Sequence, residues 1–438
     1  MRLWSVAAYL FLPYALVSLI WRGLRYPAYL RRLSERFGFG PGFTADRVIW
    51  VHAVSVGEVR SSAALIEALA ERMPRHRVLV TTMTPTGAEQ VQMLFGDRVL
   101  HSYLPYDFPD AVRRFLKRFQ PELAIIAETE FWPNLFHACV KRSIPLNVVN
   151  ARLSPDSFRR YSLVPRTVRR MFQAAERICA QSPLDAQRFR NLGVEHQPLT
   201  VTGNLKFDVA LPDAVHEQGR AFRRQWGVDR SVLIAASTHP GEEAAILAVH
   251  ANLLQRFPDL LLVLAPRHPE RFGSVARLCR RSGFETWRRT SLNGELPATS
   301  SALVADTMGE LQMFYAAADI AVIGGSFVRH GGQNPLEAFA VGVPAIFGPH
   351  MFHFEEITAL SLERGAARQV SGPEMLTRAI ALYLEQPALR RAAGAAAISL
   401  VHENRGALER TLTALDRRLS TVAGEAQAGI AANLHVGG

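Results

Sequence analysis

The sequence predicts an α/β protein with two doubly wound domains. Short apolar runs rich in β-branched residues alternate with helix-length intervals, which is typical of βαβ units around a parallel sheet. This alternation stops at a polar connector and then starts again, which indicates a second domain of the same kind. A chain of 438 residues, of which 48% are hydrophobic and 20% charged, is long enough to form two hydrophobic cores.

The predicted strands form two groups along the chain. The first group covers residues 47–54, 76–83, 123–128, 145–151, 177–182 and 198–204. The second group covers residues 231–238, 260–268, 302–307, 320–327 and 344–349. We therefore expect an N-terminal Rossmann-like domain over 23–207, a linker over 208–230, a C-terminal Rossmann-like domain over 231–422 and a flexible tail over 423–438.

The N-terminal segment carries no charged residue from Leu3 to Trp21. A stretch of about 20 apolar residues has the length of a bilayer-spanning helix, and the segment holds aromatic residues of the kind found at membrane interfaces. No small-residue cleavage site follows, so a retained membrane anchor over 1–22 is predicted in place of a removed signal peptide. Pro13 predicts a kinked or shallow helix. The alternative is a buried hydrophobic helix of a soluble domain.

The chain is strongly basic, with 50 Lys and Arg against 39 Asp and Glu and a net charge of +11. This surplus suits an anionic partner, which the charge alone leaves open among nucleic acid, acidic lipid and a phosphorylated substrate. Five arginines follow the apolar segment: Arg22, Arg25, Arg31, Arg32 and Arg36. By the positive-inside rule, they predict that the body of the protein lies on the cytoplasmic side of the membrane.

Ligands of parallel sheets bind at the carboxyl ends of the strands, so the residues that follow each predicted strand are the candidates for function. The segment HAVSVGEV follows the first strand and turns into a helix that carries Glu58 near its start. A carboxylate there either complements the helix dipole or serves as a functional acid at the ligand edge. This local pattern leaves both interpretations open.

Two more acids and a lysine follow later strands of the first domain. Glu128 and Glu130 stand two residues apart ahead of Phe131 and Trp132, and on an extended strand end they would point the same way. They are candidates to bind a sugar-like ligand, and the alternative is a helix cap beside a packed aromatic pair. Lys206 follows the last strand, where it either neutralises a phosphate or carboxylate or is simply solvated.

The second domain carries residues suited to phosphates and nucleotides. The segment STHPGEE places hydroxyls and His239 at a helix N-terminus, which suits a phosphate. APRHPER offers Arg267 and His268, and GGSFVRHGGQNPLEA offers glycines for close backbone approach, followed by Asn334 and Glu337. A glutamate at that helix start can accept hydrogen bonds from both ribose hydroxyls.

Several other classes of site are not supported by the sequence. It contains no Walker A lysine motif and no GxGxxG. His239, His268 and His330 lack metal-ligand spacing, which favours phosphate-binding or structural histidines. The three cysteines, Cys139, Cys179 and Cys279, are too widely spaced for a zinc knuckle or a disulfide framework, and they predict a reducing, cytoplasmic setting.

Eight segments together resemble one family. They are HAVSVGEV, ETEFWPN, NARLS, TGNLKFD, STHPGEE, APRHPERF, GGSFVRHGGQNPLEA and FGPHMFHFEE. In this order they are similar to the 3-deoxy-D-manno-octulosonic acid (Kdo) transferase family of lipopolysaccharide assembly, from the N-terminal segment to about Arg410. The resemblance implies a GT-B fold, in which two doubly wound Rossmann-like domains face a cleft, with an N-terminal membrane-anchor helix.

The resemblance also implies the reaction and its partners. It implies an inverting glycosyltransferase that transfers Kdo from CMP-Kdo, held by the C-terminal domain, to a lipid A precursor, lipid IVA, held by the N-terminal domain. No metal ion or other cofactor is expected. The protein is expected on the cytoplasmic face of the inner membrane, where its arginines meet anionic lipids, and no nucleic acid is expected as a partner.

Residue by residue, the resemblance makes Glu58 the general base and Glu128 and Lys206 the transition-state stabilisers. The CMP contacts fall on Pro266, Arg267, Met308, Gly309, Glu310, Asn334, Pro335, Leu336 and Glu337. One alternative is another GT-B enzyme, a transferase or epimerase that uses a UDP-sugar. A membrane-tethered nucleic-acid binder would explain the charge but would have no use for the three carboxylates Glu58, Glu128 and Glu337.

Overall fold

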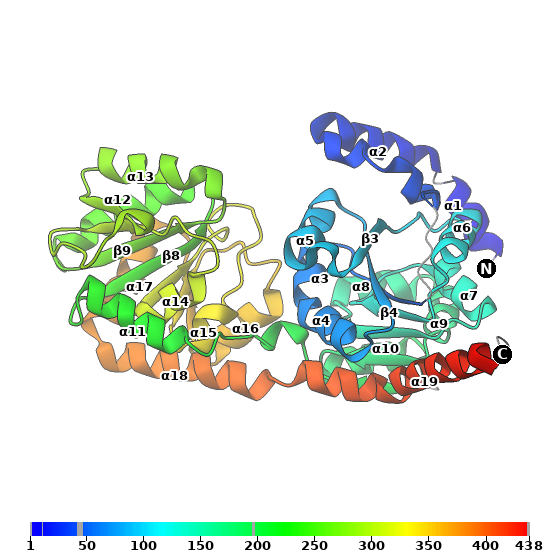
Figure 1. Cartoon of the computed structure of the whole chain (residues 1–438). Coiled ribbons are helices and arrows are strands. Elements are labelled where there is room, and N and C mark those ends of the chain that lie inside the picture. The colour runs from blue at the N-terminus through cyan, green and yellow to red at the C-terminus, as the bar shows by residue number, and fades with distance from the viewer. Residues whose placement is uncertain (1, 11, 42–46, 195–197, 436–438) are drawn as a thin grey trace. The chain divides into compact units, whose positions relative to one another are not determined.

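The computed structural model describes residues 2–10, 12–41, 47–194 and 198–435, and it divides the chain into two compact units (Figure 1). Unit 1 comprises Met1–Asp208 and Arg405–Gly438, and unit 2 comprises Val209–Asn404. Within the described residues, each unit holds one parallel sheet of seven strands. The predicted doubly wound α/β class is therefore confirmed for both units.

The sheet of unit 1 has the strand order β3-β2-β1-β4-β5-β6-β7. Its strands are β1 Val48–His52, β2 Arg77–Thr82, β3 Leu100–Tyr103, β4 Leu123–Ala127, β5 Leu146–Ala151, β6 Arg177–Ala180 and β7 Leu199–Val201. Alternate residues of β1 belong to two different cores, since Val48 and Trp50 pack in one cluster and Ile49 and Val51 in another. Both faces are thus buried, which explains why the strands are continuous apolar runs.

The helices of unit 1 begin at residues that favour helix starts. Every helix from α5 to α10 has proline at its first position, where the missing N–H costs nothing. They are α1 Arg2–Leu10, α2 Leu12–Arg25, α3 Val56–Ser61, α4 Ala63–Arg72, α5 Pro85–Phe95, α6 Pro109–Phe119, α7 Pro133–Lys141, α8 Pro155–Ser162, α9 Pro165–Phe172, α10 Pro183–Asn191 and α19 Ala407–His435. Short 3₁₀ turns include η1 Pro27–Leu30, η2 Leu33–Phe37, η3 Gly96–Arg98 and η4 Leu205–Phe207.

The sheet of unit 2 has the strand order β10-β11-β9-β8-β12-β13-β14. Its strands are β8 Val232–Thr238, β9 Leu261–Pro266, β10 Thr286–Arg288, β11 Ala302–Val304, β12 Ile320–Ile323, β13 Ala345–Phe347 and β14 Ala367–Gln369. Its helices are α11 Val215–Trp226, α12 Glu242–Leu254, α13 Phe272–Arg281, α14 Leu311–Ala317, α15 Leu336–Ala340, α16 Glu355–Glu363, α17 Pro373–Glu385 and α18 Pro387–Asn404, with 3₁₀ turns η5 Pro269–Arg271 and η6 Arg289–Ser291.

The domain boundaries differ from the expected ones at both ends of unit 2. Most of the expected linker, 208–230, forms α11, which packs into unit 2 through Phe222, whose ring lies 5.1 Å from that of Phe314. Unit 2 ends at Asn404 and not at residue 422, because α19 returns to unit 1 and joins the core that contains α4 (Figure 1). The expected flexible tail continues α19 as far as His435, and 436–438 lie outside the described residues.

The expected N-terminal anchor is two helices, α1 and α2, bent by 44° close to Pro13. Among the described residues no single helix is long and apolar enough to span a bilayer, although this bent pair passes on length and composition. The kink predicted from Pro13 is confirmed. The alternative of a buried helix is wrong for most of α2, because Tyr14, Val17 and Leu24 are 68%, 66% and 78% exposed.

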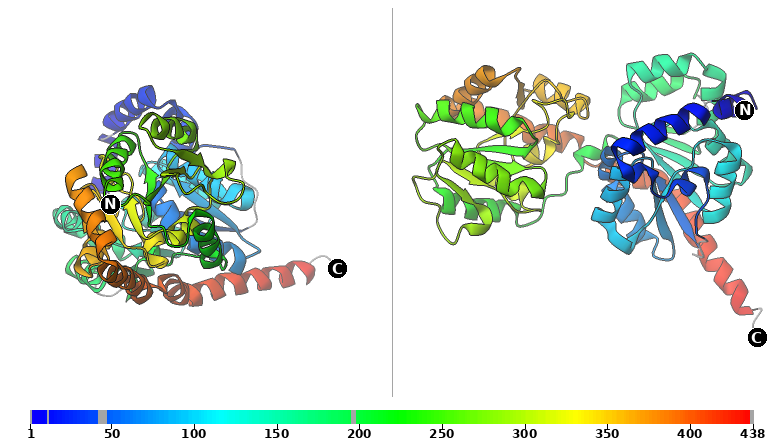
Figure 2. Two further views of the ribbon diagram at one scale, coloured as in Figure 1. Left: turned by 90° about the vertical axis from the view of Figure 1, so that its left-hand side faces the viewer. Right: turned by 90° about the horizontal axis from the view of Figure 1, so that it is seen from above.

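Helix α1 is fixed to unit 1 by its aromatic side chains. Trp4 Nε1 donates a hydrogen bond of 2.9 Å to Asp107, and the Trp4 ring lies 5.0 Å from that of Phe131. Tyr9 stacks on Phe108 at 5.2 Å. In the views of Figure 2, the blue α1–α2 segment accordingly lies against unit 1.

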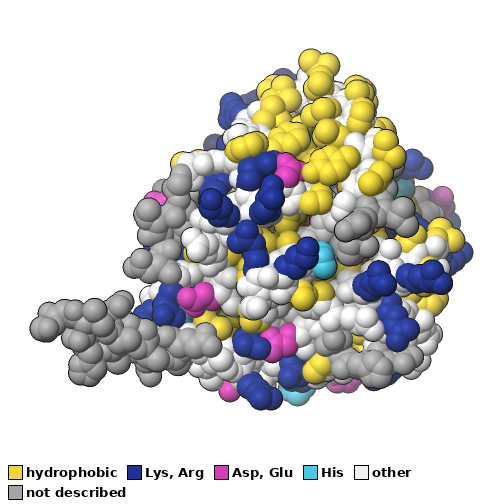
Figure 3. Space-filling model, turned by 90° about the vertical axis from the view of Figure 1, so that its right-hand side faces the viewer, with side chains coloured by type: hydrophobic (Ala, Val, Ile, Leu, Met, Phe, Trp, Pro, Cys, Tyr) yellow, Lys and Arg dark blue, Asp and Glu magenta, His cyan; other side chains and the backbone are white. Residues whose placement is uncertain are grey.

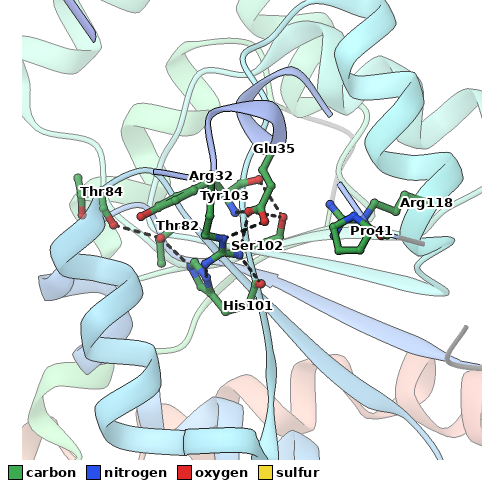
Figure 4. A network of polar contacts seen from close by, with 9 residues as sticks. All are labelled: Arg32, Glu35, Pro41, Thr82, Thr84, His101, Ser102, Tyr103 and Arg118. Carbon is green, nitrogen blue, oxygen red and sulfur yellow. Dashed lines mark hydrogen bonds and ion pairs between the residues drawn. The ribbon is translucent and has the colours of Figure 1, made fainter. Parts of the chain in front are cut away.

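A polar network ties the segment after α2 to the edge strand β3 (Figure 4). The buried carboxylate of Glu35 accepts hydrogen bonds from Ser102 Oγ and Tyr103 N at 3.1 and 2.9 Å and pairs with Arg32 at 2.8 Å. Arg32 also contacts His101 Nδ1 at 2.9 Å, and burial together with Arg32 lowers the pKa of His101 to about 3. Arg36 is 2% exposed, so the expectation that it meets acidic lipids is wrong.

Candidate active site

Glu58 lies in the connection that follows β1, at the third position of helix α3. Ser55 is the N-cap of this helix, and its hydroxyl donates to Glu58 Oε1 at 3.1 Å. Val54 N donates to Glu58 Oε2 at 2.6 Å. This arrangement resembles a capping box, in which a serine and a glutamate three residues later satisfy the free N–H groups of a helix start. Glu58 therefore stabilises the start of α3, where its negative charge also suits the helix dipole, as one of the two interpretations expected.

The capping carboxylate is also electrostatically unusual. Glu58 is 8% exposed, and burial, followed by the negative charges of Glu128 and Glu130, raises its pKa well above the usual range. Burial and Glu128 raise the pKa of Glu130 to about 7. A carboxyl group with a raised pKa is suited to general acid–base catalysis, so the capping contacts of Glu58 and its acid–base interpretation are compatible.

Glu128 and Lys206 form an ion pair at the same edge of the sheet. Strand β4 ends at Ala127, and Glu128 adopts a left-handed backbone with φ of 57° while its N–H donates to Val149 O at 2.9 Å. Its Oε1 lies 3.7 Å from Lys206 Nζ, and the two side chains are 22% and 16% exposed. Because Glu128 has left the extended strand, the strand-end alternation considered for Glu128 and Glu130 does not apply.

The aromatic residues that follow these acids are packed, but the helix cap of the alternative interpretation is not formed, because α7 has Trp132 as its N-cap and no side-chain cap hydrogen bond. The Trp132 ring lies 6.1 Å from that of His52, and Phe131 lies between Trp4 and Tyr161, at 5.0 and 5.4 Å. This packing gives the acidic segment a partly apolar wall. The structure therefore brings Glu58, Glu128 and Lys206 to one edge of the unit 1 sheet and adds Glu130 to them.

Unit 2 has a small pocket of about 80 Å³ at the carboxyl ends of its strands. Ten residues line it: Ser237, Ala265, Pro266, Arg267, Ala305, Thr307, Met308, Gly309, Leu311 and Phe314. Four of the nine residues predicted to contact CMP are among them, namely Pro266, Arg267, Met308 and Gly309. Ser237 has a left-handed backbone with φ of 55°, which turns the chain at the end of β8.

The other five predicted donor residues lie outside this lining, as far as the structure describes it. Glu310 is the N-cap residue of α14 and pairs with Arg289 at 3.1 Å, and Asn334 Oδ1 accepts a hydrogen bond from Leu336 N at 3.0 Å. Leu336 is fully buried, so it serves the core. Burial, followed by the charge of Glu337 on α15 beside Pro335, raises the pKa of Tyr315. Of these residues, Glu310 and Asn334 hold their local backbone and side-chain neighbours in place.

Glu242 and Glu243, which the sequence identifies only as part of a helix start, bind other segments of unit 2. The buried carboxylate of Glu242 accepts hydrogen bonds from the backbone N–H groups of His239, Gly325 and Phe327, at 2.8, 2.8 and 3.0 Å. Glu243 pairs with Arg271 at 2.5 Å. Two adjacent glutamates directly after a glycine suggest a helix N-terminus, but no local signal identifies their distant partners.

Comparison with known proteins identifies the family. Residues 31–209 match the family model described as 3-Deoxy-D-manno-octulosonic-acid transferase (kdotransferase). Over 393 residues the chain is 41% identical to the 3-deoxy-D-manno-octulosonic acid transferase of Haemophilus influenzae. The aligned region covers 89% of this chain and 92% of that protein. The chain belongs to the Kdo transferase family. The Kdo transferase of Bordetella pertussis is 40% identical over 378 residues, 84% of this chain and 86% of its own.

Solved structures of similar fold include a putative UDP-N-acetylglucosamine 2-epimerase from Listeria monocytogenes, with a TM-score of 0.53 and 14% identity over 86% of this chain and 98% of its own. A glycosyltransferase from Rickettsia africae gives a TM-score of 0.52 at 14% sequence identity. The match covers 87% of this chain and 99% of that structure. At this identity the likeness shows the fold alone, which confirms the GT-B class. The predicted membership of the Kdo transferase family is confirmed by the sequence relatives.

Proposed function

We propose that this Kdo transferase transfers Kdo from CMP-Kdo to a lipid A precursor, lipid IVA, with inversion at the anomeric carbon. The observation that carries the proposal is the buried Glu58, whose pKa is raised at the ligand edge of unit 1. The Glu128–Lys206 ion pair in the same unit and the Arg267 pocket in unit 2 support it. The identity to Kdo transferases over most of the chain supports the choice of sugar.

In the proposed reaction, the Glu58 carboxylate accepts the proton of the acceptor hydroxyl as the hydroxyl oxygen bonds to the anomeric carbon. The bond between that carbon and the donor phosphate breaks, and CMP leaves with the electron pair. The anomeric carbon carries no hydrogen and is crowded, so positive charge develops on it before the new bond is complete. Glu128 and Lys206 would stabilise the separating charges, with Lys206 fixed in position by the carboxylate.

CMP-Kdo carries a single phosphodiester charge, less than a nucleoside diphosphate sugar. Arg267, which lines the pocket, suits this charge, and we propose that neither a metal ion nor another cofactor is needed. Pro266, Met308 and Gly309 would contact the nucleotide. Glu310 and the segment 334–337 would shape the nucleotide site, and the Glu337 carboxylate would accept hydrogen bonds from the ribose hydroxyls.

The direct test is transfer to a tetraacylated lipid A precursor from CMP-Kdo generated in the assay. We expect a product heavier than the acceptor by one or more Kdo residues. If the protein consumes UDP-sugars and leaves CMP-Kdo untouched, the UDP-sugar alternative replaces this proposal.

The three neighbouring carboxyl groups predict a pH effect. Glu130→Gln removes a negative charge that raises the pKa of Glu58, so the pKa of Glu58 should fall. Since the base acts in its deprotonated form, the acidic limb of the kcat–pH profile should move to lower pH. The same exchange at the exposed Glu71, on α4 of the same unit, is the matched control and should leave the profile in place. An unchanged profile for Glu130→Gln would contradict the coupling.

We further propose that α1 and α2 attach the protein to the cytoplasmic face of the inner membrane. Figure 3 shows exposed hydrophobic side chains gathered on this part of unit 1, with Lys and Arg side chains beside them. Leu24 and Tyr14 are among the most exposed of these apolar residues, and Arg22 and Arg31 are exposed nearby. Apolar burial combined with attraction to acidic headgroups supports binding to anionic lipids.

The attachment predicts that Val17→Asp combined with Leu24→Asp will lower the fraction of protein that floats with phosphatidylglycerol-containing vesicles at least about tenfold, because two apolar contacts are lost and two like charges meet the headgroups. Val228→Asp, at an apolar residue of unit 2 that is 64% exposed, is the matched control. Equal flotation of the double variant and the control would refute attachment through α2.

A further inference from the structure

Three histidines meet at the carboxyl ends of the unit 2 strands, and the proposed mechanism uses none of them. His239 follows β8, His268 follows β9 and His330 follows β12. The ring centre of His239 lies 3.8 Å from that of His330 and 5.6 Å from that of His268. We call these three residues the histidine trio.

The strand order places the trio between two segments assigned to the donor. Strand β8 lies between β9 and β12 in the sheet. Arg267 of the pocket follows β9, and the segment 334–337 follows β12, so His239 stands between them. The trio does not line the pocket itself, but His268 directly follows Arg267. His239 directly follows the strand end that carries Ser237, so a ligand that extends from the pocket along this edge meets the trio.

The ring of His239 is held in one orientation. It is 4% exposed, its Nε2 lies 3.1 Å from the amide nitrogen of Gln333, and its backbone N–H is fixed by Glu242. An amide nitrogen can only donate, so Nε2 accepts this hydrogen bond and the neutral ring carries its proton on Nδ1. A ring held in this way is pre-organised to donate a hydrogen bond.

The surroundings of the trio favour an anion over a cation. Burial, followed by the charges of His330, His268, Arg267 and Arg271, lowers the pKa of His239 to about 4. The nearby acids are already bonded: Glu242 accepts three backbone N–H groups, and Glu243 pairs with Arg271. Glu270 lies 3.9 Å from His268 at the surface. Within the described part of the chain, no three His, Cys, Asp or Glu side chains are placed to hold a metal ion.

We propose that the histidine trio binds the carboxylate of the Kdo sugar in the donor, an inference that rests on the proposed CMP-Kdo specificity. The donor carries two oxyanions, the phosphodiester and the sugar carboxylate. Arg267 in the pocket suits the phosphodiester, which leaves the second oxyanion for the trio beside the pocket. Histidine N–H groups and a positive environment supply charge-assisted hydrogen bonds to such a group. The trio would then select an acidic sugar over a neutral one.

The test uses His268→Ala and His330→Asn, since both side chains are exposed and their loss should leave the fold intact. Each variant should raise the KM for CMP-Kdo about tenfold or more, with a smaller change in kcat, because a hydrogen bond to a charged group is lost. The Kd for CMP, measured by calorimetry, should stay within about twofold, since CMP lacks the sugar carboxylate. His402→Asn, at an exposed histidine of α18 in the same unit, is the matched control.

Three other results would each overturn a different statement. If the Kd for CMP weakens as much as the KM for CMP-Kdo, the trio binds the phosphodiester and the carboxylate assignment is wrong. If neither value moves, the trio does not bind the donor. If the wild-type protein binds CMP but transfers nothing from CMP-Kdo, the proposed function fails and not this inference alone.

Discussion

Replacing Glu58 by glutamine is expected to lower kcat for Kdo transfer by about 10²- to 10⁴-fold, the usual contribution of a general base. Glutamine keeps the size of the side chain and can still accept the hydrogen bond from Val54 N, so helix α3 should keep its start. It cannot accept a proton at neutral pH. Binding of CMP, measured by calorimetry, should be unchanged, because the predicted CMP contacts belong to unit 2.

Ser55→Ala separates the structural function of Glu58 from its chemical function. It removes the cap hydroxyl, which should cost about 1 kcal/mol of stability, but it leaves the carboxylate in place. Its kcat should therefore fall only a few-fold while its Tm drops. If Glu58→Gln behaves in the same way as Ser55→Ala, Glu58 is only a cap, and the base must be sought at Glu128 or Glu130.

The capping contacts and the proposed base function of Glu58 show what local sequence can and cannot tell. The serine, glycine and glutamate after a strand predict a helix start, and the structure has one. The same residues do not encode burial or the two other carboxyl groups, which lie in the segment after β4, about 70 residues further along the chain. The acid–base interpretation therefore depended on the resemblance to a family and on the order of strands, not on the motif.

The strands were predictable for a simple physical reason. Parallel strands buried on both faces are continuous apolar runs, and each predicted run contains or overlaps an observed strand. Three edge strands were missed, because they are short and carry polar residues: β3 Leu100–Tyr103, β10 Thr286–Arg288 and β14 Ala367–Gln369. The residues that follow the strands were good candidates because the carboxyl ends of parallel strands share one edge of the sheet.

The domain boundaries were harder to predict, because they depend on contacts between distant segments. The sequence of α19 does not show which of the two sheets this helix will pack against, since an apolar helix face can pack against either sheet. The decisive contact is Asp208, whose carboxylate accepts hydrogen bonds from the backbone of Gly406 and Leu408 at 2.6 and 2.5 Å. These hydrogen bonds join the start of α19 to the last residue of the first segment of unit 1. The two segments of unit 1 are separated in the sequence by the roughly 200 residues of unit 2.

The second large effect is expected at Gly324, directly after β12. A Cβ atom there would lie 2.3 Å from the carbonyl oxygen of Ser237 and 2.7 Å from the Cα of Thr238. Both are backbone atoms, so no side chain can rotate away. Gly324→Ala should destabilise unit 2 by about 3 kcal/mol, at the upper end of the usual cost of overpacking. The measurement is the Tm of the full-length protein.

The same substitution should weaken CMP binding, because the strand end that must move carries Ser237 into the donor pocket and His239 into the trio. Gly372→Ala is the matched control, since a Cβ there meets no atom within 4 Å and its φ of 169° is extended backbone. Below the Tm, a folded Gly324→Ala protein with a weakened Kd for CMP would show that the close approach of the β8 and β12 loops shapes the donor site. An unchanged Kd would mean that Ser237 can move without disturbing the nucleotide, and Arg267 with the β11 loop would then suffice to hold it.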